Sequence, residues 1–284
     1  MNLPDSLRAF FAEQSWGAVV AAQPVGGGCI NNATRIETEH GPLALLKTNP
    51  TAPPDMFARE ADGLRALSVD GGPRGPAVYA VAPDWILLEF IESAPRRPNH
   101  AETLGVQLAA LHSVTNNRFG FEHDNYIGST PQPNGWMEDG HAFFARRRLR
   151  FQGRLALERG LLSQSDHAAL GKLIGKLPEL VPAQPASLIH GDLWGGNIMV
   201  GPDGEPVLID PAVHYGWAEA ELAMTALFGR LPAAAYRAYA EARPLAPGYE
   251  DRFDLYNLYH LLNHLNLFGR SYHGQVLAIL RRYT

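Results

Sequence analysis

The sequence has only one cysteine, so no disulfide can form within the 284-residue chain. Chains without disulfides are typical of reducing compartments, and we predict a cytoplasmic protein. No apolar run approaches the roughly 20 residues that a membrane-spanning helix needs. The first 13 residues lack the basic start and the long apolar middle of a signal peptide. We therefore expect no membrane partner.

Signals for several other classes of protein are also missing. The net charge is −5 and no long basic run is present, so we expect no nucleic-acid partner. No spacing of histidine and cysteine indicates a zinc site. With 46% hydrophobic and 19% charged residues, the composition is that of a globular protein. The length suits one large domain or two lobes that share a cleft.

The N-terminal part of the sequence predicts a β-rich unit with one long helix. Alternating polar and apolar residues flank turns rich in glycine and proline, which is the pattern of antiparallel strands. Asp55 directly precedes an amphipathic segment and is a candidate helix N-cap. The expected elements are a short helix within 1–13, a hairpin of 33–38 and 43–47, a helix over 56–67, and strands over 77–82 and 85–90.

The rest of the sequence predicts mainly helices. A segment rich in proline and arginine, 89–98, links the two compositions. We therefore expect an α+β fold of two lobes, a β-rich N-terminal lobe over 1–91 and a mainly helical C-terminal lobe over 92–284. The expected helices cover 101–112, 141–158, 165–177 and most of the chain after 219, with an ordered loop over 119–136.

Two strand-like runs in the second half each end beside an aspartate. Asp192 follows the first run, Asn197 comes five residues later, and Asp210 ends the second run. A strong turn signal at 201–204 predicts a hairpin that brings these three side chains together. Alone, each is an ordinary turn or cap residue. As a set they match phosphoryl transfer from ATP, with Asp192 as the catalytic base and Asn197 and Asp210 as Mg²⁺ ligands.

A lysine and a glutamate are expected to form a buried ion pair. Lys47 ends an apolar strand, and Glu60 lies on the apolar face of the following helix. A carboxylate in an apolar stripe is costly without a cation. Lys47 is the nearest candidate, and a strand lysine held by a helix glutamate binds the ATP phosphates in kinases. The alternative places Glu60 at the edge of the stripe, in contact with water.

A glycine-rich stretch precedes the first predicted hairpin. It matches neither of the common phosphate-binding glycine patterns, and a flexible turn is the alternative. Glycine lets backbone N–H groups approach phosphate closely, so its place just before the Lys47 strand favours a cover for the nucleotide. The candidate ATP-binding residues of this loop are Gly26, Gly27, Gly28, Cys29, Ile30 and Asn31.

Candidate substrate residues surround the aspartates in sequence. They are mostly aromatic and would suit a sugar or an amine, although core packing is the common role of such residues. Glu219 and Glu221 either orient the Asp210 region or cap the next helix through its dipole. The candidate substrate residues are His190, Trp194, Tyr215, Trp217 and Trp136.

Over nearly its whole length the sequence resembles the fructosamine kinases, also called ketosamine kinases, within the protein-kinase-like and aminoglycoside-phosphotransferase-like group. Two segments separate this family from other small-molecule kinases, Asp124-Asn125-Tyr126-Ile127-Gly128 and Leu193-Trp194-Gly195-Gly196-Asn197. Further matching segments are Gly27–Asn31, Met56–Leu67, Ser129–Asn134, Phe143–Leu149, His190–Asp192, Ile209–Ala212, Tyr215-Gly216, Ala223-Met224 and Leu227–Gly229.

The resemblance implies both a fold and an activity. The implied fold is two lobes with ATP between them. The implied reaction is ATP-dependent phosphorylation of the 3-hydroxyl of a ketosamine, the rearranged product of amine glycation, which frees the amine and so repairs it. It also implies that Asp192 is the base, that Lys47 and Glu60 set the phosphates, and that Glu89, Phe90 and Ile91 form a hinge under adenine.

The sequence departs from the family at two places. After Tyr215-Gly216 the family usually has Asp-Arg-Glu and an Asp two residues further on. Here the run is Trp217-Ala218-Glu219-Ala220-Glu221, which lacks the arginine and has Glu221 in place of that Asp. His141 stands where tryptophan is common. An arginine near the site would hold an acid or a phosphate, so acceptor preference or efficiency is expected to differ.

Two other functions remain compatible with the motifs. A kinase for another small hydroxyl or amino compound, such as an aminoglycoside or choline, would share Asp192, Asn197 and Asp210. A nucleotide-binding protein without turnover would bind ATP and transfer no phosphate. For the ketosamine kinase, the sequence does not choose between free and protein-bound substrates, or between a monomer and a redox-linked homodimer.

The single thiol, Cys29, is expected to make activity sensitive to oxidation. Because it lies in the glycine-rich loop near cationic groups, we expect a partly ionised thiol that oxidises readily, whereas a buried, inert thiol is the alternative. Peroxide should then lower the kinase activity and dithiothreitol should restore it in a steady-state assay. Activity that responds to neither reagent would remove this hypothesis.

Overall fold

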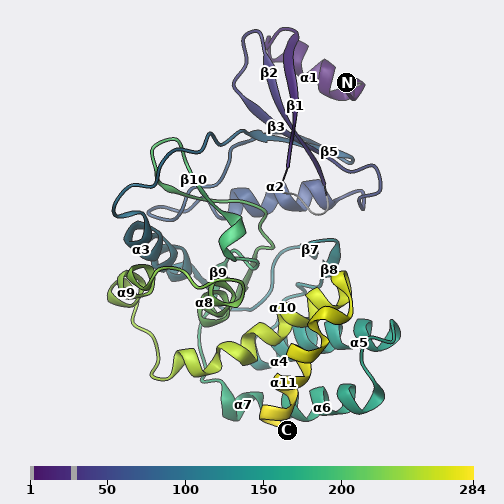
Figure 1. Ribbon diagram of the computed structural model, residues 1–284, viewed down its shortest axis with the longest axis vertical. Helices are drawn as coiled ribbons and strands as arrows, with labels where there is room; N and C mark the ends of the chain where they lie inside the picture. Colours follow the sequence, from purple (N-terminus) through teal and green to yellow (C-terminus); the bar gives the residue numbers. More distant parts are fainter. Residues whose placement is uncertain (1–2, 27–30) are drawn as a thin grey trace.

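The computed structural model describes residues 3–26 and 31–284, so the predictions made for Gly27, Gly28, Cys29 and Ile30 lie outside the described residues. The first part is an antiparallel sheet with a helix on each face (Figure 1). Its elements are α1 (Asp5–Glu13), β1 (Val19–Val25), β2 (Asn32–Thr38), β3 (Ala44–Thr48), α2 (Met56–Ala66), β4 (Val78–Ala82) and β5 (Trp85–Glu89).

The five strands are ordered β1-β2-β3-β5-β4. Alternation of side chains along the strands gives the sheet two apolar faces. On one face Leu7 and Phe11 of α1 pack against Ile36 and Leu87. On the other, the apolar stripe of α2 packs against β5 and contains the buried Phe57. In Figure 1, α2 lies between the sheet and the second part of the chain, and Gly63 of this helix lies close to Pro211 and Val213 of that part.

The second part is mainly helical, as expected. Long helices surround short strands, and the loops that carry Asp192 and Asp210 follow two of these strands. Its elements are α3 (His100–Ser113), β6 (Thr115–Asn116), β7 (Asn125–Ile127), β8 (Thr130–Gln132), α4 (Gly140–Phe143), η1 (Phe144–Leu149), α5 (Arg150–Glu158), α6 (Gln164–Gly175), α7 (Leu177–Leu180), β9 (Ala186–Ile189), η2 (Gly195–Asn197), β10 (Ile198–Val200), β11 (Pro206–Leu208), β12 (His214–Gly216), α8 (Ala218–Leu227), α9 (Ala233–Ala242), η3 (Tyr249–Arg252), α10 (Phe253–Phe268), η4 (Arg270–Tyr272) and α11 (His273–Tyr283).

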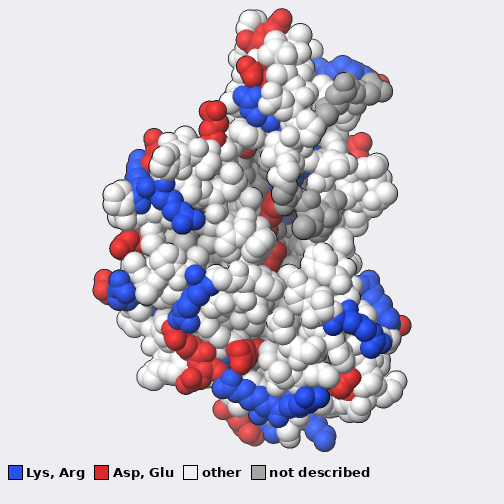
Figure 2. Space-filling view, in the orientation of Figure 1, with Lys and Arg blue, Asp and Glu red and all other residues white. Residues whose placement is uncertain are grey.

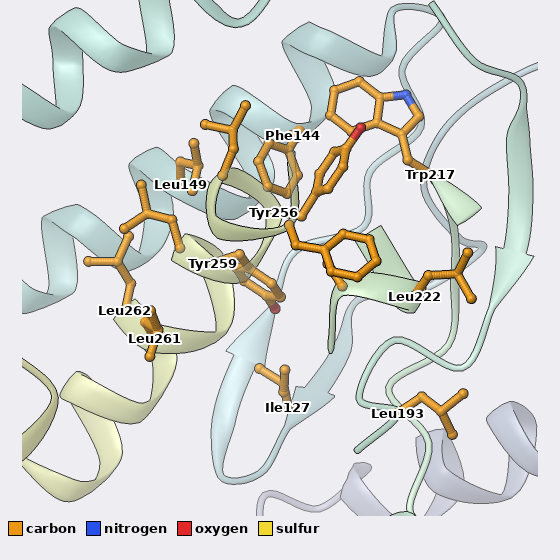
Figure 3. Close-up of a cluster of buried hydrophobic side chains, with 14 of the residues drawn as sticks. Ile127, Phe144, Leu149, Leu193, Trp217, Leu222, Tyr256, Tyr259, Leu261 and Leu262 are labelled. Atoms are coloured by element: carbon orange, nitrogen blue, oxygen red, sulfur yellow. The ribbon is translucent and has the colours of Figure 1, made fainter. Parts of the chain in front are cut away.

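The core of the second part lies under its short strands. β9 is the middle strand of a sheet with β12 and β6. Figure 3 shows aromatic and leucine side chains of this core, among them Phe144, Trp217 and Tyr256, which contact one another. All four residues of β9 are buried, three apolar ones and Ser187, so the strand is held on both faces. Its C-terminal end, from which the catalytic loop leaves, is therefore fixed in place.

Some local details differ from the sequence prediction. Strand β1 was not predicted, because the segment Val19–Val25 has no clear apolar alternation and contains Pro24. Asp55 precedes α2 but its side chain does not cap the helix, because it accepts a hydrogen bond from Tyr126 at 2.7 Å. The loop over 119–136 contains the short hairpin β7–β8.

In the described part of the chain, none of the helices has the length and apolar character needed to cross a membrane.

Close packing of α3 on α9 generates a testable pair of glycine substitutions. A Cβ at Gly105 would collide with the backbone carbonyl of Ala235, which cannot move without moving α9. A Cβ at Gly171, inside α6, would meet nothing within 4 Å. We expect Gly105→Ala to lower the free energy of unfolding by about 1 to 3 kcal/mol.

In the matched control, Gly171→Ala should be neutral or raise it by up to about 1 kcal/mol. Urea denaturation of both variants measures the difference. Equal stabilities would show that the contact between α3 and α9 adjusts to the extra methyl group.

Candidate active site

A large cavity in the described structure lies between the sheet with α2 and the helical part. Its volume is about 570 Å³, within the usual range for sites that hold small ligands. Figure 2 shows the molecule hollowed at this level, with acidic atoms inside the hollow. Most of the residues predicted to bind ATP, metal or acceptor line this cavity: Gly26, Asn31, Lys47, Glu60, Glu89, Phe90, Ile91, Asp192, Trp194, Asn197 and Asp210.

Asp192 lies on a loop that a buried glutamate holds from behind. The loop leaves β9 after Ile189 and turns at Gly191, whose φ of 83° favours glycine. The carboxylate of Glu221 accepts hydrogen bonds from the backbone N–H groups of His190 at 2.8 Å and Gly191 at 2.7 Å. Glu221 therefore orients the loop that carries Asp192, a role different from the two considered from the sequence, which were to orient the Asp210 region or to cap the next helix.

A histidine completes this anchor. His112 of α3 lies 3.0 Å from Glu221 through Nε2, and its Nδ1 lies 2.9 Å from the hydroxyl of Tyr239. Both Glu221 and His112 are fully buried in side chain. Although burial acts to raise the pKa of Glu221, hydrogen bonds from His112 and the His190 backbone lower it overall, so the carboxylate stays charged. Glu219 has a different role, because it pairs with Arg252.

The turn between β10 and β11 brings Asn197 and Asp210 together, as predicted. Ile209 N–H donates to the Asn197 carbonyl at 3.1 Å. The amide nitrogen of Asn197 donates to the Asp192 carbonyl at 2.8 Å, which places all three residues in one cluster. Asp210 has a φ of 55°, in the left-handed region that aspartate tolerates better than most residues. The hairpin therefore fixes the backbone positions of Asn197 and Asp210, and the left-handed conformation of Asp210 sets the direction in which its carboxylate points.

Lys47 joins the two parts of the protein. Its ammonium donates to Glu60 at 2.6 Å and also contacts Asp210. The predicted pairing with Glu60 is confirmed, and the contact with Asp210 was not foreseen. Burial acts to lower the pKa of Lys47, but the carboxylates of Glu60 and Asp210 outweigh it and raise the pKa above its ordinary value. The lysine is therefore charged at neutral pH.

The carboxyl group of Asp192 has a raised pKa. Burial is the main cause, and the negative charges of Asp210 and Glu221 add to it, so that the pKa of Asp192 rises to about 7. A carboxyl group with a pKa near the working pH exchanges a proton readily, which suits a general base.

The hinge predicted under adenine contributes both backbone and side chains to the cavity wall. The N–H groups of Glu89 and Phe90 donate to Ala77 and Leu43, at 2.8 and 3.1 Å. The N–H of Ile91 donates to none of the described residues. The Glu89 carboxylate is held by Arg74, so the side chain is already paired.

Several of the candidate substrate residues are not part of the cavity wall. Trp194 lines the cavity and is 39% exposed. Trp217 is buried in the core against Phe144 and Tyr256 (Figure 3), and His190 is fully buried, so the substrate prediction was wrong for both. Tyr215 pairs with β9 and contacts Trp136, and neither lines the cavity. The structure assigns these four side chains to packing.

Other residues on the acceptor side of the cavity were missed. They come from α2, from the β7–β8 hairpin and from the end of α10. Asn125 and Tyr126 belong to a segment already noted as typical of the resembling family, which was the available signal. The α10 residues gave none, because their pattern is that of an ordinary buried helix. The missed cavity residues are Arg59, Asn125, Tyr126, Asn263, His264, Leu267 and Phe268.

The sheet with its helix, the Lys47–Glu60 pair and the Asp192, Asn197 and Asp210 cluster define a phosphotransferase of the protein-kinase-like fold. A thermostable mutant of the aminoglycoside phosphotransferase APH(4)-Ia, solved with AMP-PNP and hygromycin B, shares this fold, with a TM-score of 0.62 at 16% identity over 98% of each chain. More specifically, the family model for fructosamine kinase matches residues 8–284. The chain belongs to the fructosamine kinase family.

Individual relatives agree with this assignment. A chloroplastic protein-ribulosamine 3-kinase of Arabidopsis thaliana is 41% identical over 271 residues, which cover 91% of this chain and 81% of the relative. A probable ketoamine kinase of a Synechocystis species is 40% identical, covering 91% and 88%. The crystal structure of a fructosamine-3-kinase candidate from Thermobifida fusca has a TM-score of 0.89 and 34% identity, covering 98% of each chain.

The raised pKa of Asp192 predicts a stability effect that depends on pH. Its pKa of about 7 in the folded protein exceeds the ordinary aspartate value of 3.8, so the folded state binds the proton more tightly than the unfolded state. Wild type therefore loses stability as pH rises from about 4 through 7. Asp192→Asn removes this charge and should raise the melting temperature of the ligand-free protein by about 2 to 4 °C at pH 8.

That advantage should shrink when the melting curves are measured at pH 5, where wild-type Asp192 is largely protonated in the folded state. A constant difference between the two pH values would mean that the charge of Asp192 is not the cause.

Proposed function

We propose that this protein transfers the terminal phosphoryl group of ATP to the 3-hydroxyl of a ketosamine, and thereby starts the release of a glycated amine. The family assignment supports the class of reaction and of acceptor. The single observation that carries the mechanism is the position of Asp192, which shares one cavity with Lys47 and Trp194. We also propose that residues 1–91 act as the nucleotide lobe and 92–284 as the acceptor lobe.

Asp192 acts as the base in this proposal. Its backbone is fixed by Glu221 behind the loop and by the Asn197 amide in front. The acceptor hydroxyl would donate its hydrogen bond to the Asp192 carboxylate, and the proton would pass to this carboxylate as the oxygen bonds to phosphorus. The pKa of about 7 lets the residue be ionised before the transfer and protonated after it.

The side chains around Asp210 fit a magnesium ion. Asn197 uses its amide nitrogen for Asp192, which leaves its oxygen as a donor atom, and Asp210 contributes a carboxylate. Oxygen donors of this kind suit Mg²⁺. When bound, the ion would neutralise charge on the phosphates. Asn197 and Asp210 would hold it, and Lys47, kept charged by Glu60, would bind phosphate oxygens directly.

The nucleotide base would lie against the hinge. The N–H of Ile91, which donates to none of the described residues, would donate to a ring nitrogen of adenine, and Leu45 and Leu88 offer apolar contact from the sheet. Arg35 stacks on the ring of Phe90 at 5.6 Å, which steadies this wall of the cavity. Gly26 and Asn31 at the ends of the glycine-rich loop lie over the same space.

Trp194 is our candidate for the sugar contact. It follows Asp192 by two residues, is partly exposed, and rests on the ring of Phe228 at 6.2 Å. Apolar faces of a sugar pack well on an indole ring. The acids of the cavity also favour an acceptor with a protonated amine, which a ketosamine carries.

The lone cysteine of the sequence supports a reducing compartment such as the cytoplasm.

Phosphate transfer in vitro tests the proposal. Mg-ATP is mixed in parallel with ribulosyl-lysine and with fructosyl-lysine, and products are read by mass spectrometry. We expect phosphorylated ketosamine with wild type and a loss of at least about 100-fold with Asp192→Asn, because the base is removed. The ratio of the two products ranks the sugars. ATP binding without transfer to either acceptor would contradict the ketosamine assignment.

The metal assignment is tested by Asp210→Ala. Loss of the carboxylate should weaken the Mg²⁺-dependent part of nucleotide binding by about 10-fold or more. Calorimetric titration of AMP-PNP at a series of Mg²⁺ concentrations measures this. Asp203→Ala, which removes an exposed acid from the turn of the same hairpin, serves as the control and should titrate like wild type. An Asp210 variant with unchanged Mg²⁺ dependence would remove this residue from the metal site.

A further inference from the structure

Arg74 lies in the connection between α2 and β4, outside every helix and strand. Its backbone is nevertheless paired with the second part of the protein. Arg74 forms an isolated parallel bridge with Val207, and the N–H of Leu208 donates to the Arg74 carbonyl at 2.8 Å. Both partners belong to β11, and Asp210 follows two residues after that strand ends. The connection is therefore docked on the strand that leads to the proposed metal ligand.

The guanidinium of Arg74 makes a second link between the same regions. Its two terminal nitrogens donate to the two carboxylate oxygens of Glu89, both at 2.7 Å. Its Nε reaches Glu205, in the turn before β11, at 3.4 Å. Glu89 also accepts the N–H of Ala77 at 3.1 Å, so its position is fixed from two sides. One side chain thus connects the first hinge residue to the hairpin between Asn197 and Asp210.

This geometry depends on arginine. A planar guanidinium can bind one carboxylate through two parallel hydrogen bonds and still donate through Nε, whereas an ammonium cannot. The hydrogen bonds from Arg74 are the main cause of the lowered pKa of Glu89, so this pair is charged at neutral pH. Arg74, Glu89 and Glu205 are all partly exposed, and such ion pairs contribute little to overall stability. The arrangement of these three residues is therefore better explained as fixing the relative positions of the hinge and the hairpin than as stabilising the fold.

We infer that Arg74 is a positioning residue that couples the adenine hinge to the metal-binding hairpin. The inference rests on the proposed function, because ATP is the ligand that spans both regions. With Arg74 in place, a nucleotide held at the hinge has its phosphates at the correct distance from Lys47, Asn197 and Asp210. Without its side chain, the backbone contact of residue 74 with β11 remains, but the link from Glu89 to the hairpin is lost and the spacing between the two regions is held less tightly.

The coupling has a specific consequence for binding. Adenosine contacts only the hinge, whereas the magnesium complex of AMP-PNP contacts both the hinge and the hairpin. The ratio of the Kd for adenosine to the Kd for Mg-AMP-PNP is the gain in affinity from the phosphates. This ratio therefore measures the coupling between the hinge and the hairpin. Arg74→Ala should leave the Kd for adenosine within about twofold of wild type and reduce the gain from the phosphates by about 10-fold, within the usual range for coupled sites.

Isothermal titration calorimetry of wild type and variants with adenosine and with Mg-AMP-PNP is the test. Glu205→Ala removes the hairpin acceptor of Arg74 Nε and leaves Arg74 on Glu89, at the cost of one exposed hydrogen bond from the Asp203 N–H. It should shift the Mg-AMP-PNP affinity in the same direction by about threefold. This second variant also keeps the test valid if Arg74→Ala folds poorly. Arg65→Ala is the control, because Arg65 is exposed on α2 and pairs only with Asp62, and it should bind both ligands like wild type.

Two results would overturn the inference. If Arg74→Ala weakens adenosine and Mg-AMP-PNP by the same factor, Arg74 supports only the hinge. If neither affinity changes, it has no role in nucleotide binding. Both differ from failure of the proposed function, in which wild type itself gains no affinity from the phosphates or transfers none to a ketosamine.

Discussion

The contact of Lys47 with Glu60 and Asp210 is the interaction on which the rest of the site depends. The lysine comes from the sheet, the glutamate from α2 and the aspartate from the loop after β11. One ammonium group therefore fixes three elements that are far apart in sequence. A nearly buried lysine without carboxylates would be strongly destabilising, so the two parts of the protein must close on each other for this charge to be satisfied. Closure of the fold and formation of the cavity are one event.

A second ionic centre, behind the catalytic loop, works in a different way. Glu221 is enclosed by His112 and by two backbone N–H groups, and it has no path to the cavity wall except through the loop that it holds. The Lys47 contacts, in contrast, border the cavity and can be exchanged for phosphate oxygens when a nucleotide binds. The site thus combines buried contacts of Glu221, which fix the position of Asp192, with contacts of Lys47 that a bound nucleotide would replace. Such a division allows binding without any change in the position of the base.

Much of the site could be predicted from sequence because its parts are local. Asn197 and Asp210 converge through a short hairpin, and Lys47 and Glu60 belong to consecutive elements. The contact of Glu221 with the loop that carries Asp192 and the pairing of Arg74 with Glu205 join residues that are further apart in sequence. No periodic pattern in the sequence predicts these contacts. Trp217 was misassigned for a related reason. An aromatic residue next to a functional segment has the same signature in the core as in a pocket, and only packing distinguishes the two.

The carboxylates in and behind the cavity explain why this arrangement suits its proposed reactants. Four carboxylates lie in or behind the cavity, those of Glu60, Asp192, Asp210 and Glu221, and Lys47 contacts two of them. The resulting surplus of negative charge adds to burial, the main cause, in raising the pKa of Asp192. A surplus of this kind is unfavourable in the free protein. Magnesium at Asn197 and Asp210 and the protonated amine of a ketosamine would each reduce it, while the phosphates of ATP are offset by Lys47 and the metal. The charge that weakens the empty fold is therefore the charge that would select the cationic reactants, and their binding would lower the pKa of Asp192 and keep more of this carboxylate ionised.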